Sequence, residues 1–183
     1  MADYTLIIRG VRGSEHYWQK GALGRGINVR ILTFEGHVPQ RINRYICTVP
    51  LSDKSLDEAD VHVRKASERL KLKFPCNNEY QTNLVKLMYC VIKDVEAVVA
   101  IAKVKDNAVQ GRTGWATTMA NDLGKDVYVY DVKSLRWYKY ENEMLRPCEI
   151  PRLPKTFAGV GSRSLCEEGK RAIDRVFKSM DRA

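Results

Sequence analysis

EAVVAIA, residues 96–102, is the most strand-like segment of the 183-residue chain. Its glutamate is followed by six apolar residues without interruption. Because successive side chains of a strand point to opposite faces, both faces of this strand would be apolar. Such strands are typical of parallel sheets that are covered by helices on both sides. The segment therefore predicts an α/β fold.

The segments around it alternate between strand and helix patterns. Short β-branched or apolar runs predict strands, and apolar residues spaced by three and four predict amphipathic helices. The expected strands are 4–8, 27–34, 96–102, 126–132 and the start of 156–173, with a shorter one near 44–49. The expected helices are 14–23, 55–72, 78–92, 115–124 and the residues after 164. This alternation predicts a Rossmann-like three-layer sandwich with a mostly parallel sheet.

The whole chain is expected to form a single domain over residues 1–183. Within it, residues 132–154 would form a hairpin and a proline-rich connector to the final strand and helix. No apolar run approaches the ~20 residues of a membrane span, and the first residues lack a signal-peptide pattern. We therefore expect a cytoplasmic protein that makes no membrane contact.

The amino-acid composition limits the kinds of molecule that the protein is expected to bind. Lys and Arg outnumber Asp and Glu by 31 to 22, which gives a net charge of +9. This balance favours nucleic acid, nucleotides or acidic surfaces as partners, although a solvated basic surface gives the same composition. The five cysteines form no C-x-x-C pair, and the three histidines are scattered. We therefore expect no metal site, no disulfide framework and no cofactor.

Three expected strand-to-helix junctions combine glycine with arginine. They are RGVRGSE (9–15), QGRTGWA (110–116) and GVGSR (159–163). In a parallel sheet all three lie at one edge, where helix N-termini and glycine backbone N–H groups favour a phosphate and arginine supplies matching donors. The candidate ligand-binding residues are Gly10, Arg12, Gly13, Ser14, Glu15, Gly111, Arg112, Thr113, Gly114, Trp115, Gly161, Ser162 and Arg163.

Each of these residues also has a purely structural interpretation. The glycines fit turns, the arginines fit an exposed surface, and Ser14 and Thr113 fit helix caps. Trp115 fits either a stacking platform for a base or a side chain packed on the sheet. Trp18 fits the core better than a ligand platform, and Asp131 fits a turn better than a contact to a ribose hydroxyl.

The three loops resemble the SLOG superfamily of Rossmann-like nucleotide-binding domains, which includes DNA-processing protein A and the LONELY GUY hydrolases. RGVRGSEHYW, QGRTGWA and FAGVGSR are similar, in this order, to the SGGARGAD..W, GGTGWA and FAGxGSR loops of small proteins common in bacteriophage genomes. The resemblance implies a nucleotide-binding protein, located in the host cytoplasm if it is viral. It leaves a homodimer open, because members of the superfamily often dimerise.

The resemblance also implies a circular permutation. The strand with the GSR loop opens the domain in the DNA-processing type, whereas here it would close the chain. Three residues depart from the family patterns. Arg9 stands where the pattern has a small serine, Glu15 replaces an aspartate, and Arg112 replaces the second glycine of GGTGWA. The two arginines would make the pocket more basic and would reshape or block it.

The leading hypothesis is a sensor or sequestering protein that binds a phosphorylated nucleoside or an ADP-ribose-like nucleotide derivative. A nucleotide or nucleoside glycosidase or transferase is the alternative. The glutamate of the LONELY GUY pattern PGGxGTxxE is absent, since Thr117 and Thr118 stand in that region. Glycosidic cleavage uses carboxylates, so Glu15 is the only candidate catalytic residue and enzyme activity is the weaker hypothesis. A single-stranded DNA-binding module of the DNA-processing type is a second alternative.

Overall fold

The computed structural model describes residues 3–180 of the chain. An eight-stranded sheet runs through it in the order β3-β2-β1-β10-β4-β7-β8-β9, and a two-stranded hairpin, β5-β6, stands apart. The strands are β1 Thr5–Ile8, β2 Asn28–Thr33, β3 Cys47–Pro50, β4 Ala97–Ala102, β5 Val104–Lys105, β6 Ala108–Val109, β7 Asp126–Asp131, β8 Arg136–Glu141, β9 Met144–Cys148 and β10 Thr156–Gly161. The helices are α1 Ser14–Leu23, α2 Asp53–Glu58, α3 Asp60–Leu70, α4 Glu79–Lys93, α5 Thr113–Asp122 and α6 Glu167–Met180.

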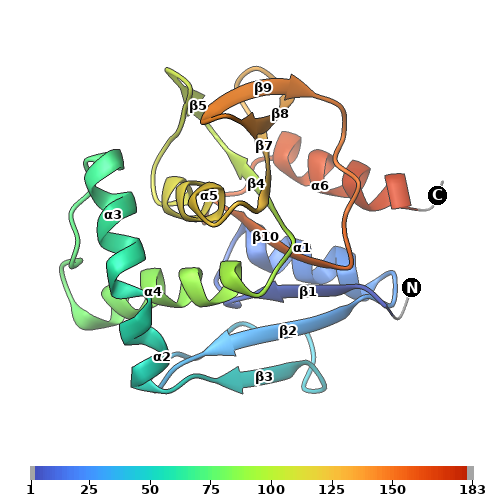
Figure 1. Ribbon diagram of the computed structural model, residues 1–183. Helices are drawn as coiled ribbons and strands as arrows, with labels where there is room; N and C mark the ends of the chain where they lie inside the picture. Colours follow the sequence, from blue (N-terminus) through green and yellow to red (C-terminus); the bar gives the residue numbers. More distant parts are fainter. Residues whose placement is uncertain (1–2, 181–183) are drawn as a thin grey trace.

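The sheet is parallel from β3 to β7 and antiparallel only at β8 and β9. The last strand of the chain, β10, lies near the middle of the sheet, where it pairs in parallel with β1 on one side and with β4 on the other. Figure 1 shows this strand between segments from the start and the middle of the sequence. A strand from the C-terminal part of the sequence thus lies between strands from its beginning and its middle.

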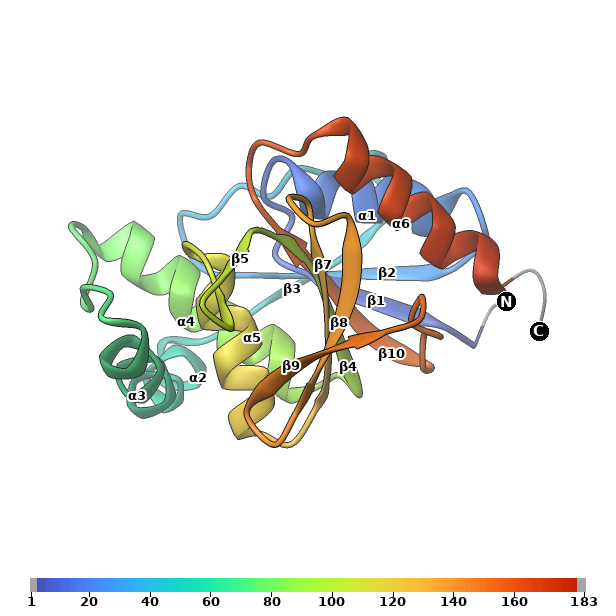
Figure 2. The same ribbon diagram turned by 90° about the horizontal axis from the view of Figure 1, so that it is seen from above.

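The helices form two layers, one on each face of the sheet. Helices α1 and α6 lie on one face, and α2 to α5 lie on the other (Figure 2). Along β4 the side chains alternate between the two cores: Val98 and Ala100 join the α2–α5 core, while Val99 and Ile101 join the α1–α6 core. All six residues of β4 are buried. The structure confirms the three-layer α/β class that the EAVVAIA segment predicts.

Some local expectations need correction. The helix expected over 55–72 is divided, because α2 ends at Glu58 and α3 starts at Asp60. Its cap is Ser52, whose hydroxyl accepts a hydrogen bond from the backbone N–H of Ser55. Residues 104–109, for which no strand or helix is expected above, form the β5-β6 hairpin. Part of the expected proline-rich connector is β9, an edge strand in which Pro147 is tolerated because edge strands leave some N–H groups unpaired.

None of the helices between residues 3 and 180 is long and apolar enough to cross a membrane.

Candidate functional site

A cavity of about 410 Å³ opens at the carboxyl ends of the central strands. It lies where the chain order of the sheet reverses: from β1 the chain moves to β2 on one side, and from β4 it moves to β7 on the other. Open α/β sheets bind ligands at such a reversal point. The volume is within the usual range for small-molecule sites, roughly 300–1,000 Å³.

All three glycine-arginine loops contribute to this cavity, but unequally. The second and third loops supply most of the predicted lining, and the first supplies two residues that were not among the candidates, Arg9 and Val11. The candidate residues that line the cavity are Gly111, Arg112, Thr113, Trp115, Gly161, Ser162 and Arg163. The candidates that the lining does not include are Gly10, Arg12, Gly13, Ser14, Glu15 and Gly114.

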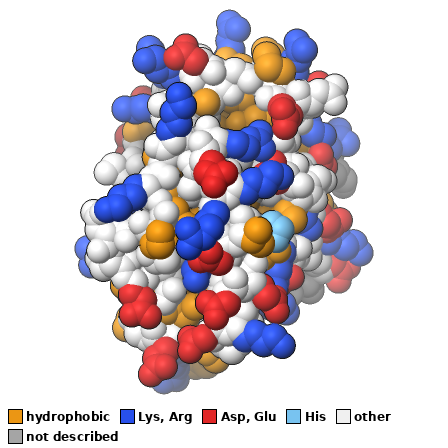
Figure 3. All heavy atoms as spheres, turned by 60° about the vertical axis from the view of Figure 1, so that its left-hand side comes forward, with side chains coloured by type: hydrophobic (Ala, Val, Ile, Leu, Met, Phe, Trp, Pro, Cys, Tyr) orange, Lys and Arg blue, Asp and Glu red, His pale blue; other side chains and the backbone are white. Residues whose placement is uncertain are grey.

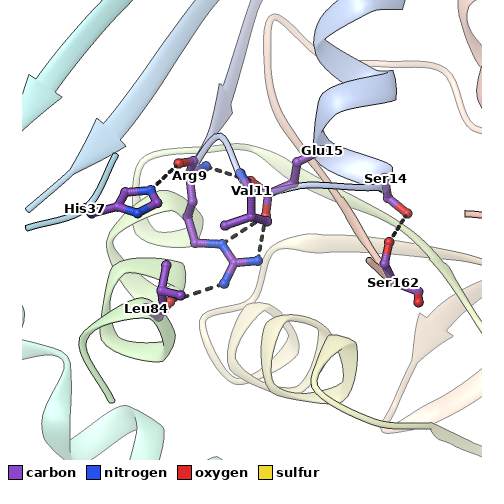
Figure 4. Close-up of polar contacts among 7 residues, drawn as sticks. All are labelled: Arg9, Val11, Ser14, Glu15, His37, Leu84 and Ser162. Carbon is purple, nitrogen blue, oxygen red and sulfur yellow. Dashed lines mark hydrogen bonds and ion pairs between the residues drawn. The ribbon is translucent and has the colours of Figure 1, made fainter. Parts of the chain in front are cut away.

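In the first loop, the Glu15 carboxylate binds the loop itself (Figure 4). Its Oε2 atom accepts hydrogen bonds from the backbone N–H groups of Arg9, at 2.9 Å, and Val11, at 3.4 Å. Its Oε1 atom accepts from Nε and Nη2 of Arg9, at 2.9 and 2.6 Å. The side chain of Glu15 is only 1% exposed, so its carboxylate holds the loop in shape and faces away from solvent.

The first and third loops are in direct contact. The backbone N–H and the hydroxyl of Ser14 both donate to the carbonyl oxygen of Ser162, each at 3.0 Å. Gly13 lies so close to the third loop that a Cβ atom would stand 2.3 Å from the Arg163 carbonyl oxygen. Gly161 is equally close to α1, since its Cβ would stand 2.4 Å from the Ser14 hydroxyl. The start of α1 is therefore capped by the third loop.

Gly10 also has a structural role. Its φ is +71°, and a Cβ there would stand 2.7 Å from Pro39. Its carbonyl oxygen accepts a hydrogen bond of 2.7 Å from the backbone N–H of Gln40. Glycine at this position lets the 35–41 segment pack against the first loop. Arg12 is exposed and makes no side-chain hydrogen bond or ion pair with any other residue in 3–180.

In the second loop, Gly111 and Arg112 face the open part of the cavity. Gly111 has a φ of +69° and open space where a Cβ would be. Nη2 of Arg112 donates to Oε1 of Gln81 on α4, at 3.3 Å, which links the start of α5 to the opposite wall. Gly114 lies inside α5, where a Cβ would stand 2.7 Å from the Val109 carbonyl oxygen, so it serves packing.

Trp115 and Trp18 are both core residues. Trp115 is 4% exposed, and its indole N–H donates to the Ser67 hydroxyl at 2.8 Å. Trp115 is also part of the cavity lining. Trp18 is fully buried and stands against Gly159, where a Cβ would meet its ring at 2.3 Å. Asp131 accepts from the backbone N–H groups of Lys133 and Ser134, which is the turn that its position favours.

In the third loop, Arg163 is the freest cation of the site. Its side chain is exposed, lines the cavity and forms no hydrogen bond or ion pair with another residue in the described range. The Ser162 hydroxyl accepts from the backbone N–H of Ser164 at 3.1 Å, so it shapes the loop.

Helix α4 provides a wall of the cavity that the sequence does not predict. Leu84, Val85 and Met88 line the cavity and are 5–6% exposed. The amphipathic pattern of 78–92 places an apolar face toward the sheet, but it does not reveal that the N-terminal half of that face borders a cavity. Arg9 crosses to this wall, because its Nη1 donates to the Leu84 carbonyl oxygen at 3.2 Å.

His37 supports the first loop from the other side (Figure 4). Its Nε2 lies 2.8 Å from the Arg9 carbonyl oxygen, and its Nδ1 lies 3.0 Å from the Tyr80 hydroxyl. A carbonyl oxygen only accepts, so Nε2 carries the proton and, in the neutral ring, Nδ1 accepts from Tyr80. The histidine thus joins the end of β1 to the start of α4.

Metal binding and catalysis by a cysteine nucleophile find little support in the described part of the chain. Residues 3–180 hold no group of three or more His, Cys, Asp or Glu side chains that could bind a metal ion. Burial raises the pKa of the Cys90 and Cys148 thiols, which disfavours the nucleophilic thiolate. The described residues that line the cavity include no carboxylate, histidine or cysteine.

The sequence matches no protein-family model and no curated protein. The fold is similar to a crystal structure from Syntrophus aciditrophicus SB, described as a "putative molybdenum carrier protein". The TM-score is 0.54, with 10% sequence identity over 94% of this chain and 93% of the other. At this identity the likeness concerns the fold alone, and it supports the Rossmann-like α/β assignment over nearly the full length.

Proposed function

We propose that the protein binds a nucleotide-derived anion, a phosphorylated nucleoside or an ADP-ribose-like molecule, as a sensor or sequestering protein. The observation that carries this proposal is the meeting of three glycine-arginine loops at one cavity of about 410 Å³ at the reversal point of the sheet. The order of the loops and their resemblance to the SLOG patterns point to the same ligand class.

The chemistry of the cavity fits such a ligand. Leu84, Val85 and Met88 form an apolar wall that suits the face of a base. Arg112 and Arg163 stand at the exposed part of the lining, where guanidinium groups can pair with a phosphate. A ligand with both an apolar ring and a negative charge would use both parts.

The charges on the face that Figure 3 shows favour a pocket ligand over a nucleic acid. Figure 3 shows the left-hand side of Figure 1 brought forward, with basic and acidic side chains interspersed over this face. Binding to single-stranded nucleic acid uses a positively charged groove together with exposed aromatic side chains. Single-stranded DNA therefore belongs in the test as a comparison, and weak binding that falls steeply with salt would mark a nonspecific charge effect.

The glycosidase alternative lacks a carboxylate in the right place. Both oxygens of Glu15 accept hydrogen bonds from the first loop, and Glu15 is absent from the described lining of the cavity. Chromatography of nucleotides incubated with the protein tests this alternative directly, since release of free base would establish turnover.

Titration calorimetry at fixed, near-physiological salt tests binding. The panel is AMP, other nucleoside monophosphates, ADP-ribose and single-stranded DNA, with molybdate added because the structural neighbour is described as a molybdenum carrier. We expect a nucleotide to bind with a Kd below roughly 100 µM, about −5.5 kcal/mol. An Arg163→Gln variant should weaken binding, whereas Arg146→Gln, on the exposed edge strand β9, should not. Failure of every nucleotide to bind at this level would exclude the proposal. Light scattering in the same buffers tests the homodimer that the resemblance leaves open.

A further inference from the structure

The charges at the inner end of the cavity are already paired. The Arg9 guanidinium is 12% exposed, and it contacts the buried Glu15 carboxylate and the Leu84 carbonyl oxygen. The Glu15 carboxylate also accepts hydrogen bonds from the backbone N–H groups of Arg9 and Val11. The carbonyl oxygen of Ser162 accepts one from the backbone N–H of Ser14. These first-loop donors are therefore not available to a phosphate. The inner end is thus close to neutral, and an anion placed there would have to displace a buried carboxylate.

The middle of the cavity is apolar. Leu84, Val85 and Met88 on α4 and Trp115 on α5 are each at most 6% exposed and all line it. The indole N–H of Trp115 donates to the Ser67 hydroxyl, so this donor is not available to a ligand. An uncharged ring or apolar group gains free energy by leaving water for such a wall.

The available positive charge is at the outer part. Arg112 and Arg163 are exposed, come from two different loops and line the same cavity. Arg163 has no side-chain partner within residues 3–180, and Arg112 has the Gln81 side-chain oxygen at 3.3 Å. Two guanidinium groups provide the donors for one phosphate or one similar anionic group.

We infer that the cavity takes a ligand with one anionic end group held at its mouth by Arg112 and Arg163, and with an uncharged apolar or aromatic body inside against α4. A bridging diphosphate inside the cavity would gain nothing from the first loop, because Arg9 is paired with Glu15 and the unpaired Arg12 is not part of the described lining. Among nucleotides this selects monophosphates over molecules of the ADP-ribose type. The inference rests on the proposed function and specifies its ligand and the direction in which that ligand enters.

Four probes separate the contributions: AMP, adenosine, inorganic phosphate and ADP-ribose, each titrated calorimetrically into the full-length protein. Adenosine lacks the anionic group and phosphate lacks the body, so each should bind at least tenfold more weakly than AMP. ADP-ribose should bind no more than about threefold tighter than AMP, because the described lining holds no unpaired arginine beyond Arg112 and Arg163 for its second phosphate. If none of the nucleotides binds, both the proposed function and this inference fail.

Variants locate the anionic group. Arg112→Gln and Arg163→Gln should each weaken AMP about tenfold and leave adenosine within twofold, while Arg146→Gln serves as the charge-matched control. Arg12→Gln tests whether the first loop, rather than the third, holds the anionic group, because Arg12 and Arg163 both lack a side-chain partner within residues 3–180. If it costs more AMP affinity than Arg163→Gln, or if ADP-ribose binds more than tenfold tighter than AMP, the single-anion inference is wrong while the proposed function stands. Circular dichroism confirms that each variant is folded.

Discussion

Arg9 and Glu15 form an ion pair inside the first loop, with Nη2 of the guanidinium 2.6 Å from Oε1 of the carboxylate. The side chains are 12% and 1% exposed. The loop pattern that residues 9–15 resemble has a small serine and an aspartate at these two positions, so both differences from that pattern belong to one interaction. The longer Glu15 side chain reaches the Arg9 guanidinium behind the cavity lining, and of the two residues only Arg9 lines the cavity.

Glu15→Gln should destabilise the protein by about 3 kcal/mol, because it leaves the largely buried Arg9 without its counter-ion. The glutamine amide also places a donor near the backbone N–H groups of Arg9 and Val11. In the wild type the Glu15 carboxylate accepts hydrogen bonds from both of these groups. Urea unfolding followed by circular dichroism measures the change. Arg9→Met in the same background should recover part of the loss, since it removes the unpaired charge. A Glu15→Gln protein as stable as the wild type would contradict the structural role given to this residue.

Gly13→Ala should cost about 3 kcal/mol or more. The φ of Gly13 is +89°, and a Cβ would stand 2.3 and 2.5 Å from the carbonyl oxygens of Arg163 and Ser162. Gly26→Ala is the matched control, because its φ is +67° but its Cβ would have nothing within 4 Å. The control should lose only about 1–2 kcal/mol for the left-handed backbone. Thermal unfolding compares the two, and equal losses would show that contact between the first and third loops contributes little.

Sequence patterns predict the frame of this molecule well, because the frame depends on local periodicity. The EAVVAIA segment predicts a doubly covered strand, and β4 is buried along its whole length. The β5-β6 hairpin was missed although its signal is present. Asp106 and Asn107 both have positive φ, at 51° and 59°, and such residues suit a two-residue hairpin turn.

The site is harder to predict, because its shape depends on contacts between distant segments. The sequence identifies Arg9 and Glu15 as unusual, but their pairing depends on how the backbone turns at Gly10 and Gly13. Leu84, Val85 and Met88 follow the apolar periodicity of α4. A helix whose apolar face packs on the sheet along its full length would show the same periodicity. Only the three-dimensional position of α4 shows where that cover ends. The ligand-binding roles of the second and third loops stay predictions.

Ser67→Ala should destabilise the protein by about 1–2 kcal/mol, because it leaves the buried indole N–H of Trp115 without an acceptor. In a Trp115→Phe background the same change should cost about 1 kcal/mol less, since the donor is gone. Chemical unfolding of the four proteins completes this cycle. Ser179→Ala is a suitable control. The Ser179 hydroxyl donates to a carbonyl oxygen of its own helix, as the Ser67 hydroxyl does, but it accepts no hydrogen bond from a tryptophan. Additive effects at the two positions would argue against Trp115 as a hydrogen-bonded core residue.

Asp131 should give the protein a stability that depends on pH. Burial alone would raise the pKa of its carboxyl group, but hydrogen bonds from Ser134, Val104 and Lys133 outweigh this and lower it. The pKa of Asp131 in the folded protein lies below its unfolded value of about 3.9. The stability that its carboxylate contributes is therefore complete above this unfolded pKa and is lost as the pH falls through the folded pKa. Asp131→Ala should therefore cost about 2 kcal/mol at neutral pH, and the difference from the wild type should shrink below about pH 4. Urea unfolding of both proteins between pH 3 and pH 7 measures that difference. A gap of constant size would mean that the carboxylate charge contributes nothing to the turn after β7 and that packing alone holds it.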